Sequence, residues 1–176
     1  MGLFDLFNTR PLTLNELMQV DAGRQERSQS LSVQLVDNYH KVKKETLWEK
    51  IRNLFKRSAR NGINMYYVIL KFNVTNIVNG NSYTVLIEFQ PNPDMNALLN
   101  NRVKIYCDCA SFKYQSAYLL NKKGSLFRSA KTDLNLGRAL TDAPDIRKTK
   151  TSNLCKHSYA CVTWMVNNIN YLMSII

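Results

Sequence analysis

No stretch of this chain is long and apolar enough to cross a bilayer. A membrane-spanning helix needs a run of about eighteen apolar residues, and no segment of the 176-residue sequence reaches that length. The first residues, Met1 to Phe4, run into Asp5 without the pattern of a signal peptide. We therefore expect no membrane span and a soluble protein that is made in a cytoplasm.

The chain also lacks the dense cysteine spacing of a disulfide scaffold. It has four cysteines in 176 residues, whereas small secreted domains that depend on disulfides carry many more for their length. This usage fits a reducing compartment, where thiols stay free to bind a metal ion.

Residue sets typical of catalytic sites are missing as well. The chain has two histidines, and its 13 acidic residues are scattered. We find no nucleophile elbow and no glycine-rich phosphate loop. The sequence therefore favours a protein that is not an enzyme.

Positive charge is in excess, with 24 basic against 13 acidic residues and a net charge of +11. Such a balance favours an acidic partner, which is nucleic acid, an anionic membrane or an acidic face of another subunit. Basic residues gather between 41 and 60 and again between 122 and 150. Either group can also be a simple solvated face.

The length and the 45% hydrophobic content predict one domain with extensions. We expect residues 1–38 to form an N-terminal arm, because residues 21–32 are polar and cannot bury enough surface to hold themselves. Residues 39–176 would then form the domain. The apolar groups in this arm are either docking anchors for a partner or strand and core packing within the same chain; they are Leu3, Phe4, Leu6, Phe7, Leu31, Val33, Leu35 and Val36.

A helix is predicted from Tyr39 to Asn61. Leu47, Ile51, Leu54 and Phe55 share one face, and the opposite face is basic. Such a helix either docks on the domain core or lies on a membrane surface.

Three strands are predicted next. Apolar residues alternate over 66–74 and over 83–89, and the sequence Asn79-Gly80-Asn81 between them is typical of a hairpin turn. A third strand over 103–109 would place Cys107 and Cys109 on one face. The fold class is therefore α+β, with a small antiparallel sheet of about three strands packed by helices.

Two helices and a long connection complete the chain. Ser111 is the predicted N-cap of one helix and Gly124 its stop. Residues 125–153 are basic, show no period and form a long connection. A final helix begins near Cys155, and its predicted inward stripe is His157, Ala160, Cys161, Trp164, Asn168, Tyr171 and Leu172.

The cysteines and one histidine form two pairs of equal spacing. Cys107 and Cys109 leave the third strand, and Cys155 and His157 open the final helix. Thiolate and imidazole are ligands that Zn²⁺ prefers in closed tetrahedral sites, so we predict a structural zinc site that clamps helix to strand. The alternative is that these are ordinary core residues. Cys161 lies one turn after His157 and is interpreted as a core thiol rather than a ligand.

The two pairs resemble the SWIM-type zinc finger, whose pattern is C-x-C followed after a variable gap by C-x-H at the start of a helix. The stretch 103–114, together with 154–157, looks most like the SWIM-like domains of virion structural proteins of tailed bacteriophages. This resemblance implies a structural protein at a neck, tail or baseplate junction, present in multiple copies in a symmetric assembly and in contact with other virion proteins through its N-terminal arm. It also implies that the protein is located in the virion after synthesis in the host cytoplasm.

A second hypothesis is a DNA-binding or protein-recruiting SWIM module. The charge of +11 supports it, and the basic connection at 125–153 is then the expected nucleic-acid contact. The basic residues are not interleaved with aromatic residues in the manner of a nucleic-acid platform.

Overall fold

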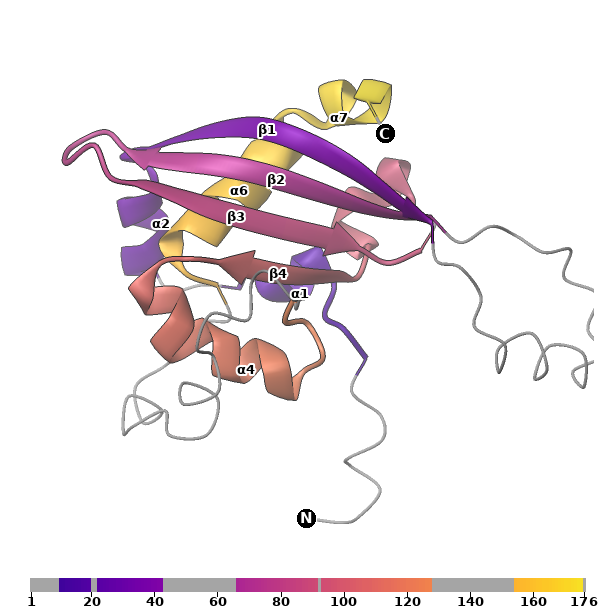
Figure 1. Ribbon diagram of the computed structural model, residues 1–176, viewed down its shortest axis with the longest axis horizontal. Helices are drawn as coiled ribbons and strands as arrows, with labels where there is room; N and C mark the ends of the chain where they lie inside the picture. Colours follow the sequence, from indigo (N-terminus) through magenta and orange to yellow (C-terminus); the bar gives the residue numbers. More distant parts are fainter. Residues whose placement is uncertain (1–9, 20–21, 43–65, 92, 128–153, 176) are drawn as a thin grey trace, which may run out of the picture.

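The computed structural model describes residues 10–19, 22–42, 66–91, 93–127 and 154–175 (Figure 1). These residues form an α+β fold around one four-stranded antiparallel sheet, which has one strand more than expected. Its elements in chain order are α1 (Leu14–Leu17), α2 (Ala22–Ser28), β1 (Leu31–Val42), β2 (Tyr66–Asn76), β3 (Ser82–Phe89), the 3₁₀ segment η2 (Met95–Asn100), β4 (Val103–Cys107), the π-helical segment η3 (Phe112–Ser116), α4 (Ala117–Lys122), α6 (Lys156–Asn167) and α7 (Ile169–Ile175).

The strands lie in the order β1-β2-β3-β4. The predicted hairpin is confirmed, since β2 pairs with β3 and Gly80 in the turn has a φ of 72°, a value that glycine adopts without strain. The predicted third strand is β4, which pairs with β3 so that Val85 lies opposite Cys107. The first ligand pair therefore lies where the last strand of the sheet ends.

Helix α6 lies across one face of this sheet and contacts all four strands (Figure 1). Alternate residues of β2 and β3 share the face that α6 covers and are fully buried, as the period of a strand requires. At the centre of this interface, Phe72 meets Trp164 edge to face with ring centroids 5.6 Å apart. The strand residues buried on this face include Val68, Leu70, Phe72, Val74, Val85, Ile87 and Phe89.

The prediction that residues 1–38 form an arm outside the domain is wrong for those of them that the structure describes. Leu14 and Leu17 of α1 are fully buried in the core, and residues 31–42 form β1, which pairs with β2. The apolar side chains of this segment do not need to form a core of their own, because the sheet and α6 supply the surface against which they are buried. The folded unit thus includes residues well before 39, while residues 1–9 lie outside the described part.

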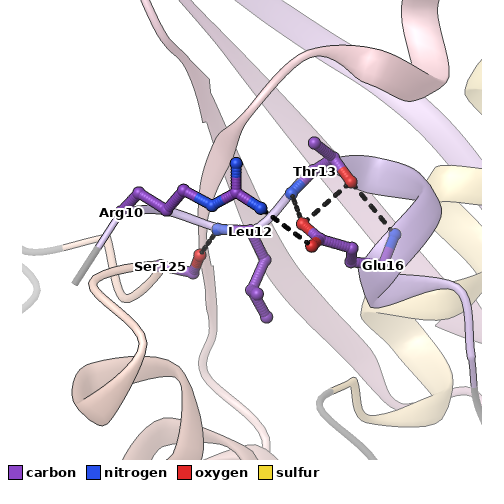
Figure 2. A network of polar contacts seen from close by, with 5 residues as sticks. All are labelled: Arg10, Leu12, Thr13, Glu16 and Ser125. Atoms are coloured by element: carbon purple, nitrogen blue, oxygen red, sulfur yellow. Dashed lines mark hydrogen bonds and ion pairs between the residues drawn. The ribbon is translucent and has the colours of Figure 1, made fainter. Parts of the chain in front are cut away.

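Figure 2 shows how residues 10–16 are held. Thr13 and Glu16 form a capping box, in which the Glu16 backbone N–H donates to Thr13 Oγ1 at 3.2 Å and the Thr13 backbone N–H donates to Glu16 Oε2 at 2.7 Å. The Leu12 backbone N–H donates to Oγ of Ser125, a fully buried residue. The start of the fold is therefore tied to a segment more than a hundred residues away.

The helix predicted over 39–61 is absent from residues 39–42, the part of this range that the structure describes. Residues 39–42 continue β1, and residues 43–61 lie outside the described part. Ser111 is not the expected N-cap, because its backbone is already helical and its side chain makes no cap hydrogen bond. Gly124, with a φ of 67°, does end the following helix.

The predicted connection at 125–153 begins inside the core. Ser125, Leu126 and Phe127 are buried, and Leu126 forms a parallel bridge with Ile105 along the outer edge of β4. Residues 128–153 lie outside the described part.

The final helix is divided at Asn168, where the backbone leaves the helical region and α7 begins. Its inward side includes the predicted His157, Ala160, Cys161 and Leu172. Tyr171 was expected to face inward but is 53% exposed. No helix in the described part of the chain has the length and apolar character that crossing a bilayer requires.

Candidate metal centre

The first ligand pair lies at the end of β4. Cys107 is its last residue, and Cys109 lies in the turn that follows rather than on the strand as expected. Asp108 between them is exposed and keeps this turn against β3, because its carboxylate accepts from the Thr84 backbone N–H at 3.0 Å. The backbone N–H of Phe112 donates to Cys109 Sγ at 3.3 Å. The Cys109 sulfur is therefore held by the first turn of the segment that follows it.

The second pair opens α6, as predicted. Cys155 is the N-cap, and its sulfur accepts from the Ser158 backbone N–H at 3.4 Å and lies 3.1 Å from Ser158 Oγ. The sulfur thus takes the place that an oxygen usually has at this position. The positive end of the helix dipole also stabilises a thiolate there.

The fold brings all four predicted ligands together. One ligand atom from each of Cys107, Cys109, Cys155 and His157 lies within 4.8 Å of the others, and all four residues are buried. Cys107 Sγ and His157 Nδ1 are 3.9 Å apart. This group of residues can hold a metal ion, although the pairs are almost fifty residues apart in the chain.

The three thiols differ in acidity. Burial disfavours the thiolate of Cys155, but hydrogen bonds from Cys107, Cys109, His157 and Ser158 lower its pKa well below the usual value. Burial, together with hydrogen bonds to Cys109 and Cys155, raises the pKa of Cys107 well above the usual value. The hydrogen bond with Cys107 lowers the pKa of Cys109, but a hydrogen bond with Cys155 and burial outweigh it and raise the pKa to about 12.

Cys161 does not belong to this group of ligands. It is fully buried on α6, and burial first, then the negative charge at Cys155, raises the pKa of its thiol well above the usual value. The interpretation of Cys161 as a core thiol agrees with this placement.

Three residues near the centre were not predicted. Tyr83 on β3 stacks on the His157 ring, Ser158 contacts Cys155, and Arg24 donates to the carbonyl of Leu154, the residue before Cys155. A serine three residues after a helix-opening cysteine is a local signal that points to Ser158. Tyr83 and Arg24 are far from the ligands in sequence, and no local pattern marks them.

Comparisons of the chain with protein-family models, with curated proteins and with solved structures found no match. A functional proposal therefore depends on the geometry of this site and on the sequence of its two ligand pairs.

Proposed function

We propose that Cys107, Cys109, Cys155 and His157 bind one Zn²⁺ in a closed structural site. The observation that carries this proposal is the placement of four buried soft donors within 4.8 Å of one another. In a tetrahedral site with Zn–S bonds of about 2.3 Å and Zn–N bonds of about 2.0 Å, a sulfur and a nitrogen ligand are about 3.5 Å apart. The 3.9 Å between Cys107 Sγ and His157 Nδ1 is longer than this by a few tenths of an ångström, so only a small movement would close the site.

A site of this kind supports a role in folding rather than in catalysis. Catalytic zinc keeps one coordination position open for water, whereas four protein ligands fill the shell. The ion would join the end of β4 to the start of α6. Binding free energies of structural zinc are about 10 kcal/mol or more, and this energy stabilises the fold directly.

Metal analysis of the purified protein tests the zinc proposal. We expect one zinc ion per chain, loss of the ion in Cys107→Ser, and an unchanged ion in the matched control Cys161→Ser, which replaces a buried thiol outside the group. Chelation should increase proteolysis of β4 and α6 together. A zinc content near zero, or an unchanged zinc content in Cys107→Ser, would refute the proposal.

For the whole chain we propose a SWIM-like structural protein of a tailed bacteriophage particle, at a neck, tail or baseplate junction, made in the host cytoplasm and built into the virion with other virion proteins. The resemblance of the two ligand pairs is the main support. A second support is the tip of the β2–β3 hairpin, where Ile77 is 68% and Val78 83% exposed. Exposed neighbouring aliphatic side chains on an ordered turn are suited to a subunit contact.

Hydrogen bonds hold this hairpin tip in one conformation. The Gly80 backbone N–H donates to the Asn76 carbonyl at 2.8 Å, and the Val78 backbone N–H donates to Asn76 Oδ1 at 2.9 Å. The Ile77 backbone N–H donates to the carbonyl of Ser30, just before β1, at 3.0 Å. A tip that is already ordered loses little conformational entropy when a partner binds it.

Particle incorporation tests the assembly role. Labelled wild-type protein should be found at a discrete position in negative-stain images of native particles. The double variant Ile77→Ser, Val78→Ser should keep its zinc and its melting temperature but fail to enter particles. The control Met173→Ser removes an exposed apolar side chain from α7 and should enter normally. Absence of the wild-type protein from particles would refute the virion role.

A DNA-binding or protein-recruiting SWIM module is the second candidate, and the charge of +11 favours it. Contacts with phosphates release counterions, so binding of this kind weakens steeply as salt concentration rises. Tight, salt-sensitive binding to bare DNA that is lost when Lys148 and Lys150 are changed to Gln would favour this function over the virion role.

A further inference from the structure

Arg24 of α2 is a nearly buried cation whose side chain donates hydrogen bonds to two distant segments of the chain. Only 9% of the surface of Arg24 is exposed to solvent. Nη1 donates to the Leu154 carbonyl, and Nη2 donates to Gln115 Oε1 at 2.9 Å. Both acceptors are far away in the chain, at 130 and 91 residues from Arg24.

These two acceptors belong to the two halves of the metal centre. Leu154 directly precedes the ligand Cys155. Gln115 lies in η3, the segment that follows Cys109 and whose first N–H, that of Phe112, donates to Cys109 Sγ. The Ser111 hydroxyl donates to the same Gln115 oxygen at 3.2 Å. One guanidinium group therefore bridges the backbone before Cys155 and the helical turn after Cys109.

The charge of Arg24 also suits this position. Three thiolates, a neutral imidazole and Zn²⁺ would carry a net charge of −1, and a buried net charge is costly unless an opposite charge lies near it. A guanidinium is always protonated, and its planar fork donates in two fixed directions, which a lysine ammonium does not reproduce. Arg24 thus places a charged bridge between the two ligand segments.

We propose that Arg24 is a positioning residue of the metal centre, which fixes the Cys109 and Cys155 segments relative to each other and slows release of the ion. This inference rests on the proposed zinc site. It assigns the N-terminal part of the fold a role in metal retention, because α2 carries the bridge.

Zinc affinity and zinc release distinguish this role from general support of the fold. The variants are Arg24→Gln, Arg24→Lys and Gln115→Ala, and the matched control is Arg27→Gln, which removes an exposed arginine from the same helix. Residues that support metal ligands typically change metal affinity 10- to 100-fold. We expect transfer of zinc to a chromophoric chelator to be faster by about tenfold or more in Arg24→Gln, less so in Arg24→Lys, and unchanged in Arg27→Gln.

A spectrum of the Co²⁺-substituted protein adds a readout that fold stability alone does not move. We expect the thiolate charge-transfer and ligand-field bands to shift in Arg24→Gln and to keep their positions in Arg27→Gln. Zinc release and Co²⁺ spectra equal to those of the wild type, with a lower melting temperature, would overturn the inference. If Arg24→Gln does not fold, Gln115→Ala decides between the outcomes, since it removes one arm of the bridge. A wild-type protein without zinc would instead refute the site itself.

Discussion

The phenol ring of Tyr83 stacks on the imidazole of His157, with ring centroids 4.1 Å apart and planes inclined by 27°. Tyr83 lies on β3, which contributes no ligand to the centre. His157 Nδ1 faces Cys107, whereas its Nε2 is buried and has no hydrogen-bond partner among the described residues. Ring stacking on Tyr83 is therefore one contact that orients this imidazole.

Replacement of Tyr83 tests that contact. We expect Tyr83→Ala to weaken zinc binding, because the imidazole then gains rotational freedom, while Tyr83→Phe keeps the stacked ring and the affinity. Supporting contacts of metal ligands are worth roughly 10- to 100-fold in affinity. Competition with a zinc chelator measures the difference. Equal affinities of the Ala and Phe variants would show that stacking does not position His157.

Thiol reactivity should separate Cys161 from the other cysteines. We expect slow modification of all thiols in the zinc-loaded protein, and rapid modification of Cys107, Cys109 and Cys155 after chelation, because loss of the ion should loosen the end of β4 and the start of α6 that bury these three thiols. Cys161 should stay slow until the chain unfolds, because it is fully buried and its raised pKa keeps it protonated. Mass spectrometry of the labelled peptides measures each site. Labelling of Cys161 together with the other three would contradict this placement.

Local patterns account for most of what the sequence predicted correctly. The β2–β3 hairpin follows from alternation on both sides of a glycine turn, and the grouping of the four candidate ligands follows from two short pairs at the ends of elements. Both signals lie within a few residues, where side-chain direction is set by the element itself. The identity of the metal stays a prediction, because geometry in the absence of an ion does not distinguish among soft-ligand metals.

Strand packing is one of the two alternatives that the sequence leaves open for residues 31–36, but the extension of β1 to Val42 is not predicted because the period is interrupted. Leu31, Val33 and Leu35 alternate toward the core, but the pairing register with β2 shifts between Leu35 and Asp37. A bulge of this kind reverses the parity of every later residue. The alternation changes phase at Val36, and residues 39–42 fall within the helix that the apolar face of Leu47, Ile51, Leu54 and Phe55 predicts.

The roles of Tyr83 and Arg24 were beyond sequence reasoning for a different reason. Tyr83 lies 74 residues before its partner His157 in the chain. Arg24 lies 91 residues before Gln115 and 130 residues before Leu154. Contacts of this length depend on the completed topology, and no local propensity encodes them.

The buried side chains of α1 allow a test of the N-terminal boundary. Leu17 is fully buried, so Leu17→Ala should lower the free energy of unfolding by about 2–5 kcal/mol. Val78→Ala at the exposed hairpin tip should change it by less than about 0.5 kcal/mol. Urea unfolding of the zinc-loaded protein measures both. Equal stability of Leu17→Ala and wild type would support an arm that is independent of the domain.

The capping box of α1 predicts how stability depends on pH. The Thr13 backbone N–H is the largest cause that lowers the pKa of Glu16 below its usual value of 4.5, and the Thr13 hydroxyl, Arg10 and Arg102 act in the same direction. A carboxyl group with a lowered pKa in the folded state stabilises the fold above the unfolded value, and this contribution is lost as pH falls through the folded value. The stability difference between wild type and Glu16→Gln should therefore be constant above about pH 5 and shrink below pH 4.5.

Two further variants accompany this test. Thr13→Ala should lower the free energy of unfolding by about 1 kcal/mol, and Glu26→Gln, which changes an exposed residue of α2, is the control. Denaturant melts of each variant between pH 3 and pH 7, at about one-unit steps, provide the measurement. A difference that grows on acidification would contradict the proposed sign.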